Sequence, residues 1–125
     1  MVKIIHWKEV FKKSEQKDQS IMLLDVRTPE ECKKGMIQDA VNISVDDLRN
    51  RLAEVPKDKK VIIYCGVGLR GYLASRILEQ NGYTNVYNLS GGYKTYQFIC
   101  QKQANEDIFE SDFIGKDDGI YQAKV

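Results

Sequence analysis

The residues with the clearest chemistry form a short loop between a predicted strand and a predicted helix. Cys65 directly follows the apolar run 61–64 and is itself followed by Gly66, Val67, Gly68, Leu69 and Arg70. Glycines let the backbone approach a ligand closely, and the amides that follow them can point inward at an anion. A helix N-terminus adds partial positive charge, and Arg70 adds a full cation. The loop is therefore predicted to favour a thiolate on Cys65 and to make it a nucleophile.

Two other interpretations fit part of this loop. Gly66, Gly68 and Gly71 match the G-x-G-x-x-G pattern of dinucleotide sites, but the next predicted strand, residues 85–89, offers no acidic residue for a ribose. A free cysteine is also commonly a small buried core residue. The position after a buried strand, the flanking glycines and the nearby Arg70 favour the nucleophile over both.

The elements that must position this loop alternate between strand and helix along the chain. The predicted strands cover residues 3–6, 21–25, 41–43, 61–64 and 85–89. The predicted helices begin after Thr28, with Pro29 and Glu31 in the first turn, after Ser44 through about Leu52, and at about Arg70 through Asn81. Because the central strands are continuous runs of Ile, Leu and Val, we expect them to be buried on both faces of a mostly parallel sheet. Cys65 then lies at the carboxyl end of a strand, where ligand sites of such sheets lie.

Length and composition indicate one domain, residues 1–100, followed by an acidic polar tail or interdomain linker, residues 101–125. The chain has 125 residues, and the tail carries six acidic against three basic side chains. Over the whole chain 19 Lys and Arg balance 18 Asp and Glu, so we expect no nucleic-acid partner and no membrane surface as partner. No apolar run is long enough to span a bilayer, and the start lacks the apolar region of a signal peptide, so the expected location is cytoplasmic.

The three cysteines are widely spaced along the chain. Cys32, Cys65 and Cys100 form no C-x-x-C pair, which argues against a disulfide scaffold and against structural zinc, so no metal site is expected. Neither Cys32 nor Cys100 has flanking loop glycines or an adjacent arginine. We therefore expect the chemistry to belong to Cys65.

Four motifs resemble the rhodanese (sulfurtransferase) domain family, and together they cover nearly all of residues 3–100. They are Leu-Leu-Asp-Val-Arg at 23–27 followed by Pro-Glu-Glu at 29–31, Gly-x-Ile-x-x-Ala-x-Asn-Ile at 35–43, Cys-x-x-Gly-x-Arg at 65–70 and Leu-Ser-Gly-Gly-Tyr at 89–93. The resemblance implies a three-layer α/β fold, with a central mostly parallel sheet flanked by helices. It also implies a sulfurtransferase, in which the loop cysteine takes a sulfane sulfur from a small donor, thiosulfate or a persulfide, and passes it to a thiol or cyanide acceptor.

The resemblance also implies roles for individual residues. Cys65 would carry the sulfur as a persulfide, the backbone amides of residues 66–70 would cradle the outer sulfur, and Arg70 would attract an anionic donor. Asp25 and Arg27, at the end of the neighbouring strand, would form a structural pair that braces the loop, with a simple surface ion pair as the alternative. Thiolate attack on a sulfur that carries a good leaving group needs no general base.

Three departures and two rival functions qualify the resemblance. Met36 stands where the family often has His, and Asp39 stands where it often has Gly. Tyr93 stands where the family frequently has Trp, and we expect it not to touch the loop. Phosphatases of the cell-cycle dual-specificity type and some arsenate reductases share the scaffold, but their cysteine loops are typically one residue longer than the spacing from Cys65 to Arg70. A non-catalytic or regulatory binding module is the other alternative, and the intact loop argues against it.

Three further segments, residues 4–7, 68–76 and 90–96, look like the C-terminal rhodanese domain of flavin-dependent CoA-disulfide or persulfide reductases. In those fusions a module that binds FAD and NADH precedes the rhodanese domain. No flavin or nicotinamide fold fits in this chain, so we expect no cofactor in it and a flavin-dependent reductase domain as a missing partner. The chain is thus expected to be an excised module, with a stand-alone domain and a docked tail as the alternative.

Overall fold

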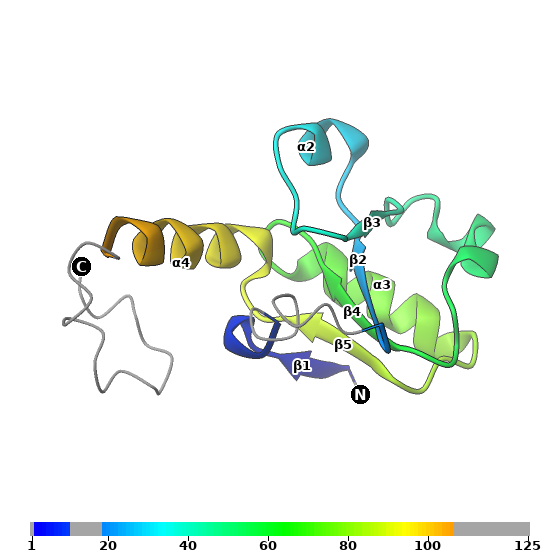
Figure 1. The fold of residues 1–125 in the computed structure, drawn as a ribbon. Coiled ribbons are helices and arrows are strands. Elements are labelled where there is room, and N and C mark those ends of the chain that lie inside the picture. Colours follow the sequence, from blue (N-terminus) through cyan, green and yellow to red (C-terminus); the bar gives the residue numbers. More distant parts are fainter. Residues whose placement is uncertain (1, 11–18, 107–125) are drawn as a thin grey trace.

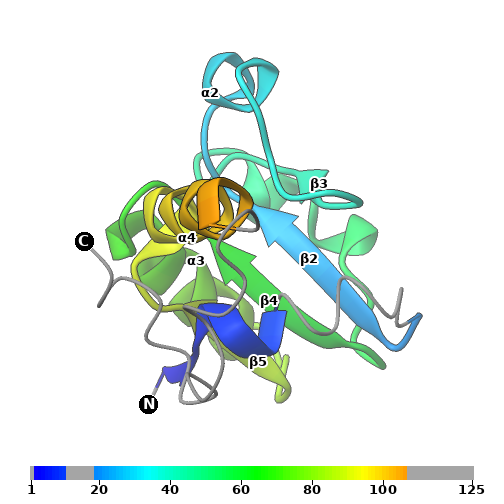
Figure 2. The same cartoon turned by 60° about the vertical axis from the view of Figure 1, so that its left-hand side comes forward.

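A five-stranded parallel sheet forms the centre of the computed structural model, which describes residues 2–10 and 19–106 (Figure 1). Its strands are β1 (Lys3–Ile5), β2 (Ile21–Asp25), β3 (Val41–Asn42), β4 (Lys60–Tyr64) and β5 (Val86–Leu89). They follow one another across the sheet in the order β1-β5-β4-β2-β3, and each neighbouring pair is parallel (Figure 2). The α/β fold with a central parallel sheet, predicted from the continuous apolar runs, is confirmed.

The central strand β4 is buried on both faces of the sheet. Val61 and Ile63 belong to one hydrophobic cluster, together with Cys65, which follows the strand. Ile62 and Tyr64 belong to a second cluster on the opposite face. Side chains alternate between the faces of a strand, so a strand covered on both sides needs an apolar residue at every position. The alternation also directs Cys65 and Tyr64 to opposite sides.

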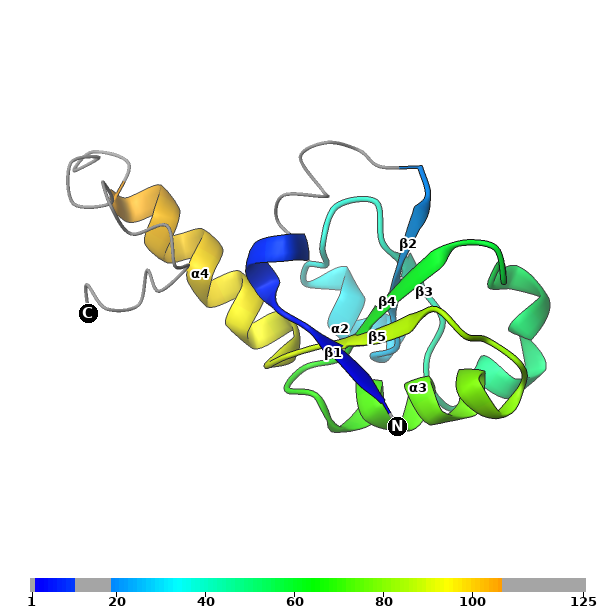
Figure 3. The same ribbon diagram turned by 90° about the horizontal axis from the view of Figure 1, so that it is seen from below.

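Helices cover the two faces unequally. The helical elements are α2 (Pro29–Lys33), α3 (Leu69–Gln80), α4 (Gly92–Glu106) and the short 3₁₀ helices η1 (Leu48–Asn50) and η2 (Leu52–Glu54). Buried residues of α3 and η1 join the first cluster, whereas tyrosines of α4 pack against the second. Figure 3 shows α3 alongside the sheet and α4 leading away from it. None of the helices within residues 2–10 and 19–106 has the length and apolar character that a membrane crossing requires.

At two places the helices of the structure differ from the boundaries expected from the sequence. The helix expected from Ser44 through Leu52 is wrong, because this segment forms a turn and then η1 and η2. The Ser44 hydroxyl bonds Asp47 Oδ2 at 3.2 Å instead of capping a backbone amide, and the chain closes short bonds such as Arg51 N–H to Leu48 O at 3.0 Å. The expected boundary between domain and tail, after residue 100, falls inside α4. Residues 107–125 of the expected tail lie outside the described part of the chain.

Candidate active site

The loop begins with Cys65, which directly follows β4 at the carboxyl edge of the sheet. The residue is 1% exposed, and its Sγ accepts a hydrogen bond from the Gly68 amide at 3.0 Å. The chain turns back on the sulfur through Gly68, whose φ of 129° is strained for residues with a side chain. The second glycine of the motif is therefore required by the turn that brings an amide to the sulfur.

The same turn aims the start of α3 at the loop. Gly68 is the N-cap residue and has no side chain that could satisfy the first amides of the helix. The first regular bond of the helix runs from the Tyr72 amide to the Gly68 carbonyl at 2.9 Å. The amides of Leu69, Arg70 and Gly71 precede it in the first turn, where helix amides lack intrahelical partners. The Gly68 amide and this helix end therefore place backbone N–H donors on the side of the loop where the sulfur lies.

The opposite side of the loop is held by the start of α4. The Tyr93 amide donates to the Cys65 carbonyl at 2.7 Å, and the Lys94 amide donates to the Gly66 carbonyl at 3.0 Å. In a planar trans peptide the N–H points away from the carbonyl oxygen, so the next amides in the loop are directed away from α4. The expectation that Tyr93 does not touch the loop is wrong, because its backbone amide binds the Cys65 carbonyl. A Cβ on Gly92 would lie 2.5 Å from the Cys65 carbonyl oxygen, so this close approach requires glycine.

Asn88, near the end of β5, braces the loop from the neighbouring strand. Its Nδ2 donates to the Gly68 carbonyl at 3.1 Å. Its Oδ1 is buried and has no hydrogen-bond partner among the described residues. A side chain on Gly71 would collide with that oxygen, which explains the glycine in the first turn of α3. Sequence reasoning noted only that this strand lacks an acidic residue, and a polar residue at a strand end was the signal it passed over.

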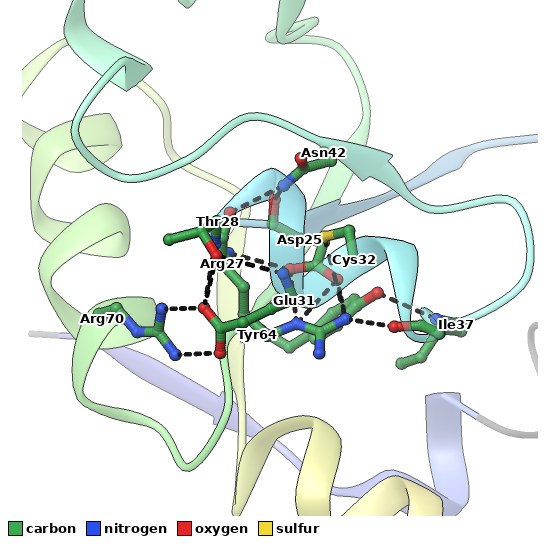
Figure 4. A network of polar contacts seen from close by, with 10 residues as sticks. Asp25, Arg27, Thr28, Glu31, Cys32, Ile37, Asn42, Tyr64 and Arg70 are labelled. Carbon is green, nitrogen blue, oxygen red and sulfur yellow. Dashed lines mark hydrogen bonds and ion pairs between the residues drawn. The ribbon is translucent and has the colours of Figure 1, made fainter.

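Arg70, the cation of the loop, is engaged by a carboxylate from α2 (Figure 4). Its Nη1 lies 2.7 Å from Glu31 Oε1, and its Nη2 lies 3.1 Å from Glu31 Oε2. The hydrogen bonds from Arg70 lower the pKa of Glu31 to about 2, and the same pair raises the pKa of Arg70. The sequence predicted Glu31 as the capping partner of Thr28, and that capping box is confirmed. The sequence did not indicate the contact between Glu31 and Arg70, because these two residues are far apart in the chain.

Asp25 and Arg27 form a buried pair one layer behind the loop. The side chains are 0% and 6% exposed, and Arg27 Nη2 lies 2.7 Å from Asp25 Oδ2. Arg27 also donates to the Gly35 carbonyl at 2.8 Å and lies over the ring of Tyr93, 4.2 Å from its centroid. Burial opposes the charge, but the bonds to Asp25 prevail and raise the pKa of Arg27. The alternative of a simple surface ion pair is wrong. Arg27 contacts the ring of Tyr93, and the Tyr93 amide binds the Cys65 carbonyl, so this residue connects the pair to the loop. That the pair braces the loop stays a prediction.

The surroundings of this pair include two further titratable groups. The Tyr64 hydroxyl accepts a hydrogen bond from the Ile37 amide at 3.0 Å, and burial raises the pKa of Tyr64. Burial, with a smaller contribution from Asp25, raises the pKa of the Cys32 thiol to about 11. Cys32 is therefore a neutral thiol near neutral pH, consistent with a structural role. All three cysteines of the chain are free.

The family follows from a comparison with known proteins. Residues 8–98 match the family model described as the rhodanese-like domain. The chain belongs to the rhodanese-like domain family. A sulfurtransferase of Allochromatium vinosum is 45% identical over 74 residues, which cover 59% of this chain and 69% of that protein.

Two solved structures extend the relationship of this rhodanese-like domain. The reduced CoADR-RHD of Bacillus anthracis aligns with a TM-score of 0.69 and 45% identity, over 76% of this chain and 16% of that one. The NAD-dependent persulfide reductase of A. fulgidus aligns with a TM-score of 0.54 and 33% identity, over 69% and 17%. The expected resemblance to the rhodanese domains of such reductases is confirmed. The chain spans about a sixth of either reductase.

Within this rhodanese-like domain the predicted site residues fall into two groups. Cys65 and residues 66–68 form the loop between β4 and α3, residues 69 and 70 begin α3, and the amide of the N-cap residue Gly68 reaches the Cys65 sulfur. Asp25 and Arg27 lie behind it, in the network drawn in Figure 4. The catalytic and binding roles of all these residues stay predictions. Glu31, Asn88 and the amides of α4 are contacts that only the folded chain reveals.

Proposed function

We propose that this rhodanese-like domain is a sulfurtransferase that carries a sulfane sulfur as a persulfide on Cys65. The observation that carries the proposal is the Cys65 sulfur, which accepts the Gly68 amide at 3.0 Å beside the uncapped start of α3. The similarity to a sulfurtransferase of Allochromatium vinosum supports the same chemistry. Thiosulfate or a low-molecular-weight persulfide would be the donor, and a thiol or cyanide the acceptor.

In the loading step the Cys65 thiolate attacks the outer sulfur of the donor. A new S–S bond forms to Cys65 while the donor's S–S bond breaks, and sulfite or a thiolate leaves with the bonding electron pair. The outer sulfur of the resulting persulfide carries the negative charge, next to the first amides of α3. An acceptor thiolate or cyanide then attacks that outer sulfur, and Cys65 leaves as a thiolate. The cycle is complete without a general base.

We further propose that a flavin-dependent reductase domain, which would supply FAD and NADH, is the partner of this domain. The similarity to the Bacillus anthracis and A. fulgidus structures supports such a partner. In this arrangement the reductase would consume or regenerate the thiol and persulfide species that pass through Cys65. The cofactors would belong to that partner, and the cytoplasmic location stays a prediction.

Intact-protein mass spectrometry tests the sulfurtransferase directly. The reduced protein and a Cys65→Ser variant are incubated with thiosulfate and, separately, with glutathione persulfide, and cyanide is added afterwards. The proposal expects the mass of one added sulfur on the parent protein, its absence on Cys65→Ser, and its removal by cyanide with thiocyanate as product. A folded, reduced protein that gains no sulfur from either donor contradicts the proposal and leaves the non-catalytic binding module as the better interpretation.

A further inference from the structure

We propose, building on the sulfurtransferase function above, that Glu31 is a specificity-determining residue that disfavours dianionic donors by neutralising Arg70. The domain would then load sulfur from an organic persulfide, whose leaving group is a thiolate, in preference to thiosulfate. The expected attraction of Arg70 for anionic donors is thereby reduced by a residue from another element. The argument rests on the geometry of the pair, on how Glu31 is held, and on the side chains around the loop.

Glu31 occupies the edge of the Arg70 guanidinium that carries Nη1 and Nη2. Two parallel contacts, 2.7 and 3.1 Å long, join Arg70 to both oxygens of Glu31. A bidentate fork of this kind matches the way arginine binds a sulfonate or phosphate, so Glu31 takes the position of an anionic ligand. A Cβ on Gly66 would lie 3.2 Å from Arg70 Nη2, which places the guanidinium directly against the loop.

The Glu31 carboxylate is held in place by its own helix. Its Oε1 accepts from the Thr28 amide at 3.1 Å and from the Thr28 hydroxyl at 3.1 Å, while the Glu31 amide donates to Thr28 Oγ1 at 3.2 Å. An exposed ion pair usually loses stabilising energy because two long side chains must be ordered. Here the capping box already orders one of them, so less side-chain entropy is lost when Arg70 binds.

The charge of Glu31 distinguishes between dianionic donors and less charged donors at the loop. Arg70 and Glu31 together carry no net charge, so a donor at the loop meets a dipole instead of a free cation. At an effective dielectric between those of a protein surface and water, a carboxylate about 6 Å from a sulfonate weakens its binding about fivefold to tenfold. A persulfide with a neutral organic body lacks the sulfonate, and its only negative charge lies on the sulfur that is transferred, so it bears less of this penalty than a dianion.

Exposed apolar side chains follow Cys65 in the chain, at the loop and along the first turns of α3, and suit an organic body. Val67, Leu69, Tyr72 and Leu73 are between 44% and 69% exposed. Exposed apolar side chains gain by covering a carbon-rich ligand and offer nothing to a small hydrated dianion. Lys94 is a second cation near the loop, since its amide binds the Gly66 carbonyl and its side chain is exposed. The test must therefore separate Lys94 from the pair.

The decisive experiment compares two donors in Glu31→Gln and in a matched control, Glu30→Gln. Glutamine keeps an oxygen for the capping box and removes the charge, while Glu30 is an exposed residue of the same turn that makes no described contact with Arg70. The donors are thiosulfate and the persulfide of 2-mercaptoethanol, and the readout is kcat/KM for loading Cys65. We expect Glu31→Gln to raise kcat/KM for thiosulfate about fivefold to tenfold, chiefly through KM, and to change the persulfide value less than twofold. Glu30→Gln should change both less than twofold.

Other outcomes would overturn the proposal. An equal effect of the two variants on thiosulfate shows a general charge effect, and a fall in thiosulfate use shows that Glu31 serves Arg70 by holding it in place. If Lys94→Gln changes kcat/KM for thiosulfate and Glu31→Gln does not, then Lys94 on α4, and not the pair of Arg70 and Glu31, determines the response to donor charge. Failure of the sulfurtransferase function itself is distinct, because then neither donor loads Cys65 in the parent protein.

Discussion

Gly92 offers the sharpest test of the contact between α4 and the nucleophile. Its φ is 65°, and a Cβ there would lie 2.5 Å from the Cys65 carbonyl oxygen and 2.6 Å from the Gly66 carbonyl oxygen. Gly91, the preceding residue, has a φ of 76°, but the atoms nearest to a Cβ there belong to the side chain of Thr95 and not to the loop. Gly92→Ala and Gly91→Ala therefore share the backbone strain and differ in whether the methyl group meets the loop.

The expected loss of folding stability has two contributions, the backbone strain and the steric clash of the new methyl group. An L-residue in the left-handed region costs about 1–2 kcal/mol in both variants. Gly91→Ala adds a clash with Thr95, whose hydroxyl can rotate away but whose Cβ, 2.8 Å from the new methyl group, can move only with the backbone of α4. Forcing a methyl group into backbone that cannot rotate costs about 1–3 kcal/mol more, so Gly92→Ala should lose about 2–5 kcal/mol in total. Relief of the clash must move the carbonyls of Cys65 and Gly66, and misplacing a reacting group by about 1 Å can cost about a hundredfold in rate.

Urea unfolding and the initial rate of sulfur loading, followed by mass spectrometry, measure the two effects. We expect Gly91→Ala to load sulfur within about threefold of the parent rate, and Gly92→Ala to load it about 10- to 100-fold more slowly while still folded. If folded Gly92→Ala loads sulfur as fast as Gly91→Ala, the carbonyl contacts with α4 do not position the nucleophile and the reasoning is refuted.

Three further changes test other contacts. Asp25→Asn strands the buried Arg27 charge and should lower the free energy of unfolding by about 3–5 kcal/mol, measured in urea, whereas Glu54→Gln in an exposed ion pair should hardly change it. Asn88→Ala removes one bond to the loop but also a buried unpaired oxygen, so it should cost only about 1 kcal/mol while slowing sulfur loading; an unchanged rate contradicts the bracing role. Because the pKa of Cys32 rises from 9.0 to about 11 on folding, the folded state favours the neutral thiol, and stability should fall as pH rises from 9.0 towards 11. Peptide mapping after iodoacetamide should show Cys32 labelled at pH 8 far more slowly in folded than in urea-unfolded protein, and equal rates would contradict this.

Local sequence signals were sufficient for the sheet and for the position of the loop after Cys65. Continuous Ile, Leu and Val predicted β2 and β4 within one residue at each end. The Thr28 cap and the glycine spacing after Cys65 marked the starts of α2 and α3. These signals work because burial on both faces, capping and positive φ each restrict the residue type at one position of the chain.

The features that sequence reasoning missed all depend on residues distant in the chain. The capping box with Thr28 is by itself a sufficient reason for a glutamate at position 31, so nothing in the local sequence indicated the contact between Glu31 and Arg70. Asn88 and Gly92 acquire their roles only when β5 and α4 come against the loop. The helix expected after Ser44 is absent because the Ser44 hydroxyl bonds Asp47 instead of capping an amide and the segment closes short 3₁₀ bonds.

The strand order has a consequence for how the domain is made. β4 lies between β2, which precedes it in the chain, and β5, which follows it, while β1 pairs with β5 so that Lys3 stands opposite Tyr87. Such contacts between distant residues slow folding, because a long loop must close before they form. Until β5 has been synthesised, one edge of β4 is unpaired and β1 has no neighbour to pair with. The loop after Cys65 therefore reaches its final contacts late during synthesis, and a nascent chain that pauses before residue 89 leaves the Cys65 thiol beside an open strand edge.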